Sequence, residues 1–363
     1  MCTRKALIYV LAPALALWGQ EERKVKKPVD GKDPATQTLP LLKDPPPAIA
    51  SETGALVFHV SPLSGKGLLS QQVRDALRNL FSENHGAQIV KLRAFVAGSG
   101  DLRRVQTLVS EIFTERKLPL PVLSTIQAGG LPAEGAQVVI ESIAAEKKTV
   151  NPNGLAFISG QQAKDVRSSI AQLQTAASAV GVEPKAVLRV TCFLGTLDDV
   201  ATARELVRTA FPGSAANFIQ LQRLVLEPVA ECEAIGRPDR APAHPVTLEN
   251  PAGLKQNPNY SQIAVVNAPK IVFSGTQMAF GSKPADLRLA FDRLGKALEP
   301  LGVGYHDVFW SGVYPLTQPV ADQIRTLRFD YYDRQRPPAS TFLLFEGLPS
   351  LDATVAVEVI AAQ

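Results

Sequence analysis

The sequence predicts an α/β protein assembled from three copies of one two-layer unit. One phrase occurs twice, as GLPAEGAQVVIESIAA at residues 130–145 and as GLPSLDATVAVEVIAA at residues 347–362. A weaker relative, EPVAECEAIG, occupies residues 227–236. When the three phrases are aligned, they share one acidic position, which is filled by Glu141, Glu233 and Glu358. Because repetition of a supersecondary unit decides the architecture of a whole chain, the repeats are interpreted first.

A second shared block lies upstream of each phrase and predicts a strand, a turn and a helix. IVKLRAFVAGSGDLRRVQTLVSEIF (89–113) aligns without a gap with VLRVTCFLGTLDDVATARELVRTAF (187–211), and FWSGVYPLTQPVADQIRTLRFDYY (309–332) follows the same plan. In the middle block, the β-branched and apolar run 187–193 is typical of a strand. Apolar residues three or four apart then share one helical face, namely Ala203, Leu206, Val207 and Ala210.

Another helix precedes each of these blocks. Its apolar stripe consists of Val73, Leu77 and Leu80 in the first copy, of Ile170, Leu173, Ala177 and Val180 in the second, and of Phe291, Leu294, Leu298 and Leu301 in the third. A glycine follows each helix, where a left-handed residue is favoured: Gly86, Gly181 and Gly302. A strand with a serine near its end precedes each helix (55–62, 154–161 and 270–277). Since paired amphipathic helices need a sheet to cover, each unit is predicted to be a two-layer sandwich.

The repeats divide the chain into six segments. A chain of 363 residues is long enough for two or three hydrophobic cores. The predicted segments are a signal peptide (1–19), a flexible Pro/Lys-rich leader (20–52), the first copy (53–148), the second copy (149–236), a Pro-rich linker (237–257) and the third copy (258–363). The leader lacks apolar periodicity and contains a proline triplet, so it is predicted to stay outside the fold.

The first residues resemble an export signal. A short basic start, MCTRK, is followed by the apolar run ALIYVLAPALALWG, which is too short to span a bilayer. Small residues at its end offer cleavage points, and a polar stretch follows. We therefore expect an exported protein, periplasmic or secreted. An uncleaved anchor helix and a wrongly assigned start codon remain the alternatives.

Composition argues against nucleic acid and membranes as partners. The net charge of +4 is too mild to favour nucleic acid, and no membrane association is expected after signal cleavage.

Cys2 would leave with the signal, and neither Cys192 nor Cys232 belongs to a CxxC motif. Two buried free thiols are the favoured interpretation. Export would also allow a disulfide, and the sequence does not decide between these alternatives.

Several segments resemble the reactive intermediate deaminase (Rid, or YjgF) superfamily. They are NGLAFISGQ, LRVTCFLGTLDDVATARELVRTAF, VAECEAIG and, in the third copy, NPNYSQIAVVN. The resemblance covers nearly all of residues 53–363, three times over. It implies chorismate-mutase-like domains, which in that family form homotrimers with a central β-barrel, outer helices and ligand clefts between subunits. Three copies in one chain therefore imply an intrachain pseudotrimer and a monomeric chain.

The resemblance also implies site residues, several of which are replaced here. Family members hydrolyse imines or enamines and hold the substrate carboxylate with an arginine, but this chain has Leu123, Ala216 and Ser340 at the three arginine positions. The acidic position of the last strand holds Val139, Glu231 and Ala356. The Ser-Gly turn falls on Ser61-Pro62, Ser159-Gly160 and Ser274-Gly275, and the N-terminal tyrosine is matched by Tyr260.

These positions give two candidate sites. Glu231, as the catalytic carboxylate, is grouped with Ser159 and Gly160, whereas Tyr260 is grouped with Ser274 and Gly275 as ligand-binding residues. The alternatives are an inherited solvent-facing strand residue and a tyrosine packed under a hairpin. Arg334 and Arg336 precede Ser340 and are weaker candidates for a replacement anion binder. The four histidines have no metal-ligand spacing, so neither a metal nor another cofactor is expected.

The sequence therefore predicts an exported Rid-like protein with clefts for a small metabolite, of imine, enamine or keto-acid type, between its copies. Residual imine or enamine hydrolysis stays open, because the carboxylate-holding arginine is missing from all three copies. The alternative is a non-catalytic ligand-binding or scaffold protein of the same fold.

Overall fold

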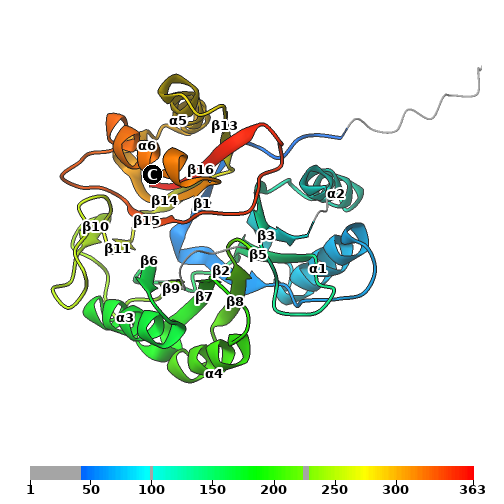
Figure 1. Ribbon diagram of the computed structural model, residues 1–363. Helices are drawn as coiled ribbons and strands as arrows, with labels where there is room; N and C mark the ends of the chain where they lie inside the picture. The colour runs from blue at the N-terminus through cyan, green and yellow to red at the C-terminus, as the bar shows by residue number, and fades with distance from the viewer. Residues whose placement is uncertain (1–41, 99–100, 224–228) are drawn as a thin grey trace, which may run out of the picture. The chain divides into compact units, whose positions relative to one another are not determined.

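Three β-sheets, each flanked by two helices, make up the described part of the chain (Figure 1). The computed structural model describes residues 42–98, 101–223 and 229–363. The predicted signal peptide and most of the predicted leader lie outside these residues. The mixed α and β fold expected from the sequence is confirmed.

The first sheet contains four strands in the order β2-β5-β3-β4. Its helix α1 buries the predicted stripe of Val73, Leu77 and Leu80, and α2 begins after Asp101, whose side chain accepts a hydrogen bond from the backbone of Arg103. The elements of this sheet are β2 (Leu56–Val60), α1 (Leu69–Glu83), β3 (Gln88–Ala97), α2 (Leu102–Glu115), β4 (Val122–Ala128) and β5 (Val138–Ala145).

The second sheet contains six strands in the order β10-β11-β6-β9-β7-β8. Its helices α3 and α4 precede β7 and β8, and each buries an apolar face against the sheet. The elements are β6 (Leu155–Ala163), α3 (Val166–Ala179), β7 (Val187–Leu194), α4 (Val200–Ala210), β8 (Ala215–Gln220), β9 (Ala230–Gly236), β10 (Val246–Glu249) and β11 (Ile263–Val266).

The third sheet has the order β1-β12-β16-β14-β15, and β13 also pairs with β16. Helices α5 and α6 precede β14 and β15. The elements are β1 (Ala48–Glu52), β12 (Lys270–Ser274), β13 (Gln277–Phe280), α5 (Pro284–Leu298), β14 (Val308–Pro315), α6 (Gln318–Leu327), β15 (Ala339–Phe342) and β16 (Ala353–Ala362).

All three sheets follow one strand order. The spatial orders are β2-β5-β3-β4, β6-β9-β7-β8 and β12-β16-β14-β15. In each run, the strand that comes last in the chain lies between the two that come first in the chain. In each sheet the only parallel pair is the one between the last two strands of its run, namely β3 with β4, β7 with β8 and β14 with β15. The predicted glycines after the preceding helices are confirmed as left-handed, with φ values of 88° at Gly86, 68° at Gly181 and 72° at Gly302.

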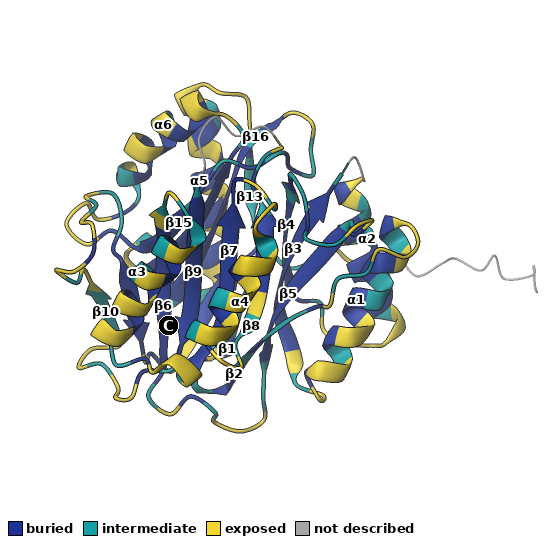
Figure 2. Ribbon diagram, turned by 60° about the horizontal axis from the view of Figure 1, so that its bottom comes forward, coloured by how far each residue is buried: buried dark blue, intermediate teal, exposed yellow. Residues whose placement is uncertain are grey.

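Hydrophobic cores lie both under the helices and between the sheets. Each sheet has its own core beneath its helix pair, and Figure 2 shows buried strands beside helices whose outer faces are exposed. Two further cores join residues from all three sheets. In one of them, Phe95, Phe193 and Phe345 pack with their ring centroids 5.7–6.1 Å apart. The surfaces of the sheets opposite the helices are therefore buried against one another.

A closed central barrel, expected from the family resemblance, is not formed by the described residues. Their strands make three separate sheets, which are joined backbone to backbone only at isolated bridges such as Gln127 to Gly347 and Gly130 to Gln220. The sheets meet mainly through side chains, and sheets that pack face to face stand too far apart for backbone hydrogen bonds.

Three predicted boundaries need correction. The predicted leader, 20–52, ends in an ordered strand, because β1 pairs with β12. The predicted linker contains β10, and β11, which was assigned to the third copy, pairs with β6 of the second sheet. The physical reason is that the outer edges of β12 and β6 carry unpaired backbone groups, which these short apolar segments satisfy.

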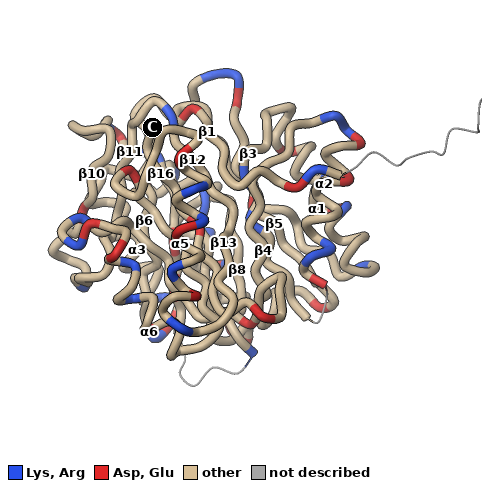
Figure 3. The backbone as a smooth tube through the Cα atoms, turned by 90° about the horizontal axis from the view of Figure 1, so that it is seen from above, with Lys and Arg blue, Asp and Glu red and all other residues tan. Residues whose placement is uncertain are grey.

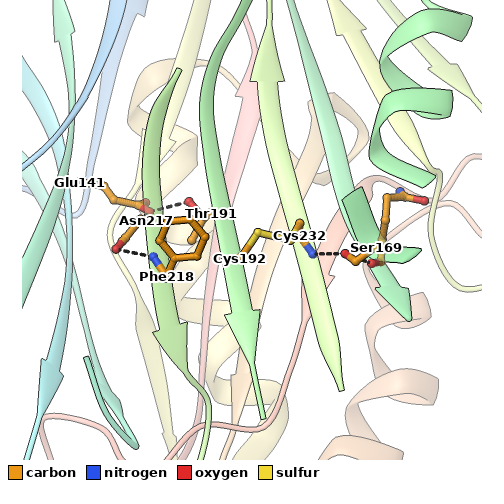
Figure 4. Close-up of a disulfide and its surroundings, with 8 residues drawn as sticks. Glu141, Ser169, Thr191, Cys192, Asn217, Phe218 and Cys232 are labelled. Carbon is orange, nitrogen blue, oxygen red and sulfur yellow. Dashed lines mark hydrogen bonds between the residues drawn. A yellow bond between two sulfur atoms is a disulfide. The ribbon is translucent and has the colours of Figure 1, made fainter. Parts of the chain in front are cut away.

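The favoured interpretation of two free thiols is wrong, because Cys192 and Cys232 form a disulfide (Figure 4). They are directly opposite partners in the antiparallel pair β7 and β9, with Cα atoms 4.1 Å apart. Both sulfur atoms lie within the core of the second sheet. The spacing of the two cysteines in the sequence could not predict this pairing, because it depends on how two distant strands align.

Positions of basic and acidic residues are interspersed along the described backbone rather than separated by sign (Figure 3). This distribution agrees with the small net charge of +4. Among the described residues, no helix combines the length and the apolar character needed to cross a membrane.

Candidate functional site

Three strands, one from each sheet, lie close to a strand of another sheet: β6 to β15, the end of β12 to β4, and the end of β2 to β8. Ser159 of β6 accepts a hydrogen bond from the backbone of Ser340, and Gly275 packs against the backbone carbonyl of Leu123. Ser61 and Ala216 line one common cavity. All three positions at which the resemblance expects an arginine therefore lie opposite a predicted Ser-Gly turn, and each holds a residue without a positive charge.

Glu231 lies against Gly160, as the grouping from the sequence expected. The carboxyl group occupies the space that a Cβ at Gly160 would need, so any larger residue there would displace the Glu231 side chain. Glu231 is 6% exposed and forms no hydrogen bond or ion pair with the described residues. Burial, reinforced by the nearby Glu233, raises the pKa of Glu231 to about 8. The group therefore holds its proton at neutral pH and can act there as an acid.

Tyr260 belongs with Glu231 rather than with Ser274 and Gly275, where the sequence grouping placed it. Burial raises the pKa of the Tyr260 hydroxyl, and the neighbouring Glu231 raises it further. The reason for the difference is the strand β11, which follows Tyr260 and pairs with β6 instead of β12. Tyr260, Glu231, Ser159 and Gly160 thus form one group, here called the Glu231 cluster.

Ser159 has a structural role within the Glu231 cluster. Its hydroxyl donates to the carbonyl of Ser261 at 2.7 Å and accepts from the backbone N–H of Ser340 at 2.9 Å. A serine hydroxyl has a single proton to donate. Since that proton is already used, Ser159 joins two sheets and offers no further donor to a ligand.

Ser274 and Gly275 also make contacts within the protein. The Ser274 hydroxyl accepts from the backbone N–H of Val359 at 2.8 Å, and its carbonyl accepts from Lys91 Nζ at 2.7 Å. The N–H of Gly275 donates to the carbonyl of Pro47 at 2.9 Å. The Ser274 carbonyl and the Gly275 N–H are therefore already hydrogen-bonded within the protein.

A cavity of about 440 Å³ opens between the first and second sheets. We call it the Arg204 cleft. Its wall has Val139 at the acidic position and Ala216 at the arginine position, and Ser61 and Phe218 are among the other residues that line it. Arg204 and Arg208 of α4 also line it, and because they are four residues apart they lie on one helical face.

Both arginines of the Arg204 cleft are exposed and retain capacity for further hydrogen bonds. Arg204 Nη2 donates to the carbonyl of Pro132 at 2.8 Å, and Arg208 pairs with Glu205, with 2.5 Å between Nη2 and Oε1. A guanidinium group has five N–H donors. Neither arginine was among the predicted site residues. The only signal in the sequence was their spacing on a predicted helix, which is shared by many solvent-facing pairs.

Six buried charges from the three sheets surround a cavity of about 20 Å³, which has room for one water molecule. This central cluster consists of Lys91, Arg93, Arg189, Glu141, Glu233 and Glu358. Its three glutamates are those that align in the repeated phrase. Burial alone would raise the pKa of Glu141, but Arg189 and Arg93 outweigh it and lower the pKa to about 2.

Each glutamate of the central cluster accepts a hydrogen bond from a neighbouring sheet. Asn217 of the second sheet donates to Glu141 at 3.1 Å, and Thr191 donates to the same oxygen at 2.6 Å (Figure 4). Thr341 of the third sheet donates to Glu233, and Ser124 of the first sheet donates to Glu358. The hydrogen bonds therefore run in a cycle from first to second, second to third and third to first sheet.

The fold and these sites define a three-sheet α/β protein with a cleft of small-molecule size between two sheets. No protein-family model matches the chain, and neither does any curated protein. Among solved structures, the chain is similar to the Rid family protein YyfB from Yersinia pestis, with 15% identity over 33% of this chain and 100% of that chain and a TM-score of 0.29.

Two further structures show similarity of the same extent. Rv2704, a YjgF-family member from Mycobacterium tuberculosis, has 19% identity over 29% of this chain and 86% of its own, with a TM-score of 0.24. TdcF from E. coli, solved with bound serine, has 21% identity over 29% of this chain and 94% of its own, with a TM-score of 0.24. YyfB and Rv2704 belong to the family that the sequence resembles.

Proposed function

We propose that this chain is an exported Rid-like protein whose three repeats form one intrachain pseudotrimer and whose Arg204 cleft binds a small carboxylate metabolite. Two features support the pseudotrimer. The three sheets share one strand order, and the glutamates of the central cluster take part in one cycle of hydrogen bonds between sheets. A cycle of equivalent contacts is what a closed assembly of like units requires.

The observation that carries the binding proposal is the pair of arginines on the open cleft. A volume of about 440 Å³ is within the usual range for small-molecule sites. Apolar residues such as Val139 and Phe218 can cover a short carbon chain, while Arg204 and Arg208 can hold a carboxylate by charge-assisted hydrogen bonds. The acidic position of this cleft is filled by Val139, so binding without hydrolysis is the function that the cleft supports best.

The binding proposal predicts that Arg204→Ala and Arg208→Ala together weaken the affinity for a short 2-keto acid. Calorimetric titration with 2-oxobutanoate should give saturable binding to the unmodified protein and an affinity lower by about tenfold or more in the double variant, because charge-assisted hydrogen bonds are lost. Arg325→Ala is the matched control. Arg325 is partly exposed and pairs with an acid three residues earlier at 2.5 Å, as Arg208 does.

Equal affinity in the double variant, or no saturable binding by the unmodified protein, would contradict this proposal and favour a scaffold role. Binding that is lost equally in Arg325→Ala would indicate a general charge effect instead of a cleft.

Imine hydrolysis at the Glu231 cluster is a second candidate function. The observation in its favour is a buried carboxyl group with its pKa raised to about 8, close enough to the Tyr260 hydroxyl to raise that group's pKa as well. Imines generated in situ by an amino-acid oxidase should then release keto acid faster in the presence of the protein, and Glu231→Gln should abolish the acceleration. The acceleration should decline as pH rises through about 8, because the acid form is lost. No acceleration at high protein concentration would exclude this activity.

Export is supported by the pairing of Cys192 with Cys232, since disulfides persist in oxidising compartments. Together with the predicted signal peptide, this pairing leads us to propose a periplasmic or secreted protein. Sequencing the N-terminus of the protein recovered from cell fractions tests the proposal, and an intact Met1 in the cytoplasmic fraction would contradict it.

A further inference from the structure

Arg328 is a buried arginine without a counter-ion in the described part of the chain. It lies in the short turn after α6, its side chain is among the largest fully buried ones, and the residue is 1% exposed. The buried cations of the central cluster, such as Lys91 and Arg93, face carboxylates at 2.7 Å. Arg328 forms no ion pair with any described residue, and burial lowers its pKa.

The Arg328 guanidinium contacts a neutral hydroxyl and an aromatic ring, and no carboxylate of the described residues. Nη2 donates to the Ser311 hydroxyl at 3.1 Å, and the Tyr332 ring centroid lies 5.3 Å from the guanidinium carbon. Arg328 Nε and the Tyr332 hydroxyl are both buried and have no hydrogen-bond partner among the described residues. A buried charge of this kind is costly unless it is paired, and each unsatisfied donor adds to the cost.

A surface pocket lies beside this buried group. The Tyr332 side chain lines a cavity of about 330 Å³ between β10 and the turn Tyr305–Asp307, with Arg336 also on its wall. Tyr332 is therefore shared by the pocket and by the group around Arg328.

We propose that Arg328, Ser311 and Tyr332 form a binding site for one small monovalent anion, either a halide or the carboxylate of a one- or two-carbon acid. The anion would accept from Arg328 Nε and from the Tyr332 hydroxyl, which are the two unsatisfied donors. Ser311 also contacts the hydroxyl of Ser340 at 3.1 Å, on the strand that faces Ser159. This site is therefore separate from the Arg204 cleft and lies behind the contact between the second and third sheets.

Chloride binding can be measured by the ³⁵Cl NMR line width of the full-length protein. We expect excess broadening that saturates with chloride and that formate displaces if the site also accepts a carboxylate. Arg328→Met should weaken the affinity by about tenfold or more, since the charge-assisted hydrogen bonds are lost. Arg334→Met is the control, because Arg334 lies over Phe329 nearby and does not line the site. Broadening displaced by formate indicates a carboxylate-competent site, and broadening that formate leaves unchanged indicates a halide site.

Equal broadening in the unmodified protein and in Arg328→Met would overturn the proposal. If Arg328→Met does not fold, Tyr332→Phe removes one donor and should still weaken chloride binding, whereas Arg334→Met should not. Crystals of the unmodified protein soaked in bromide give an independent readout. An anomalous peak in contact with Arg328 Nε supports the site, and bromide found only elsewhere overturns it.

Discussion

We expect Arg93→Met to lower the free energy of unfolding by about 3–5 kcal/mol, the usual cost of removing one partner from a buried ion pair. Arg93 Nε donates to Glu141 at 2.7 Å, and its Nη2 pairs with Glu233 of another sheet. The substitution keeps the apolar stem but leaves two buried carboxylates short of a cation. Urea unfolding at neutral pH measures the change.

Arg103→Met is the control for Arg93. Arg103 also pairs with a carboxylate, Asp101, but 77% of its side chain is exposed, so its loss should change stability by less than about 1 kcal/mol. A double variant, Arg93→Met with Glu233→Gln, should recover part of the loss because one unpaired charge is removed. If Arg93→Met were as mild as Arg103→Met, the central cluster would not hold the sheets together.

The second large effect is the pH dependence of stability that Glu231 causes. The folded protein keeps the Glu231 proton up to about pH 8, whereas an unfolded glutamate loses it near pH 4.5. The free energy of unfolding should therefore fall as pH rises from about 4.5 to 8 and level off above that range. Glu231→Gln should not show this loss, so it should become more stable than the unmodified protein by up to about 5 kcal/mol above pH 8.

Urea unfolding of both proteins at several pH values between 4 and 9 measures this difference, and Glu83→Gln, at an exposed helical position, is the control. A difference between Glu231→Gln and the unmodified protein that stays constant over the whole range would show that Glu231 titrates normally. A difference confined to pH values below 4.5 would contradict the direction of the pKa shift.

Local patterns predicted the elements of this fold well. The stripe of Val73, Leu77 and Leu80 is buried as its helical spacing required, and the glycines after the helices are left-handed. Such features depend on residues within one or two turns of each other. The alignment of Glu141, Glu233 and Glu358 was also informative, because all three side chains meet in the central cluster.

Features that depend on which distant segments meet were missed. Tyr260 was grouped with Ser274 because both were assigned to the third copy, but the pairing of β11 with β6 brings it close to Glu231. Arg204 belongs to a cleft only because α4 lies beside residues of the first sheet. The disulfide required knowledge that Cys192 and Cys232 are opposite one another in β7 and β9. Strand partners and register are set by the tertiary structure, which local periodicity does not encode.

The strand β1 has a consequence for the order in which this protein folds. A ribosome releases it before every other described strand, yet its partner β12 is synthesised far later, and Thr53 nearby hydrogen-bonds to Ala268 across 215 residues of chain. The pairing of β1 with β12 can form only after the chain has been synthesised as far as Ser274. Contacts between segments so distant in the chain slow folding. Before β12 is available, β1 is an unpaired strand and is prone to aggregation.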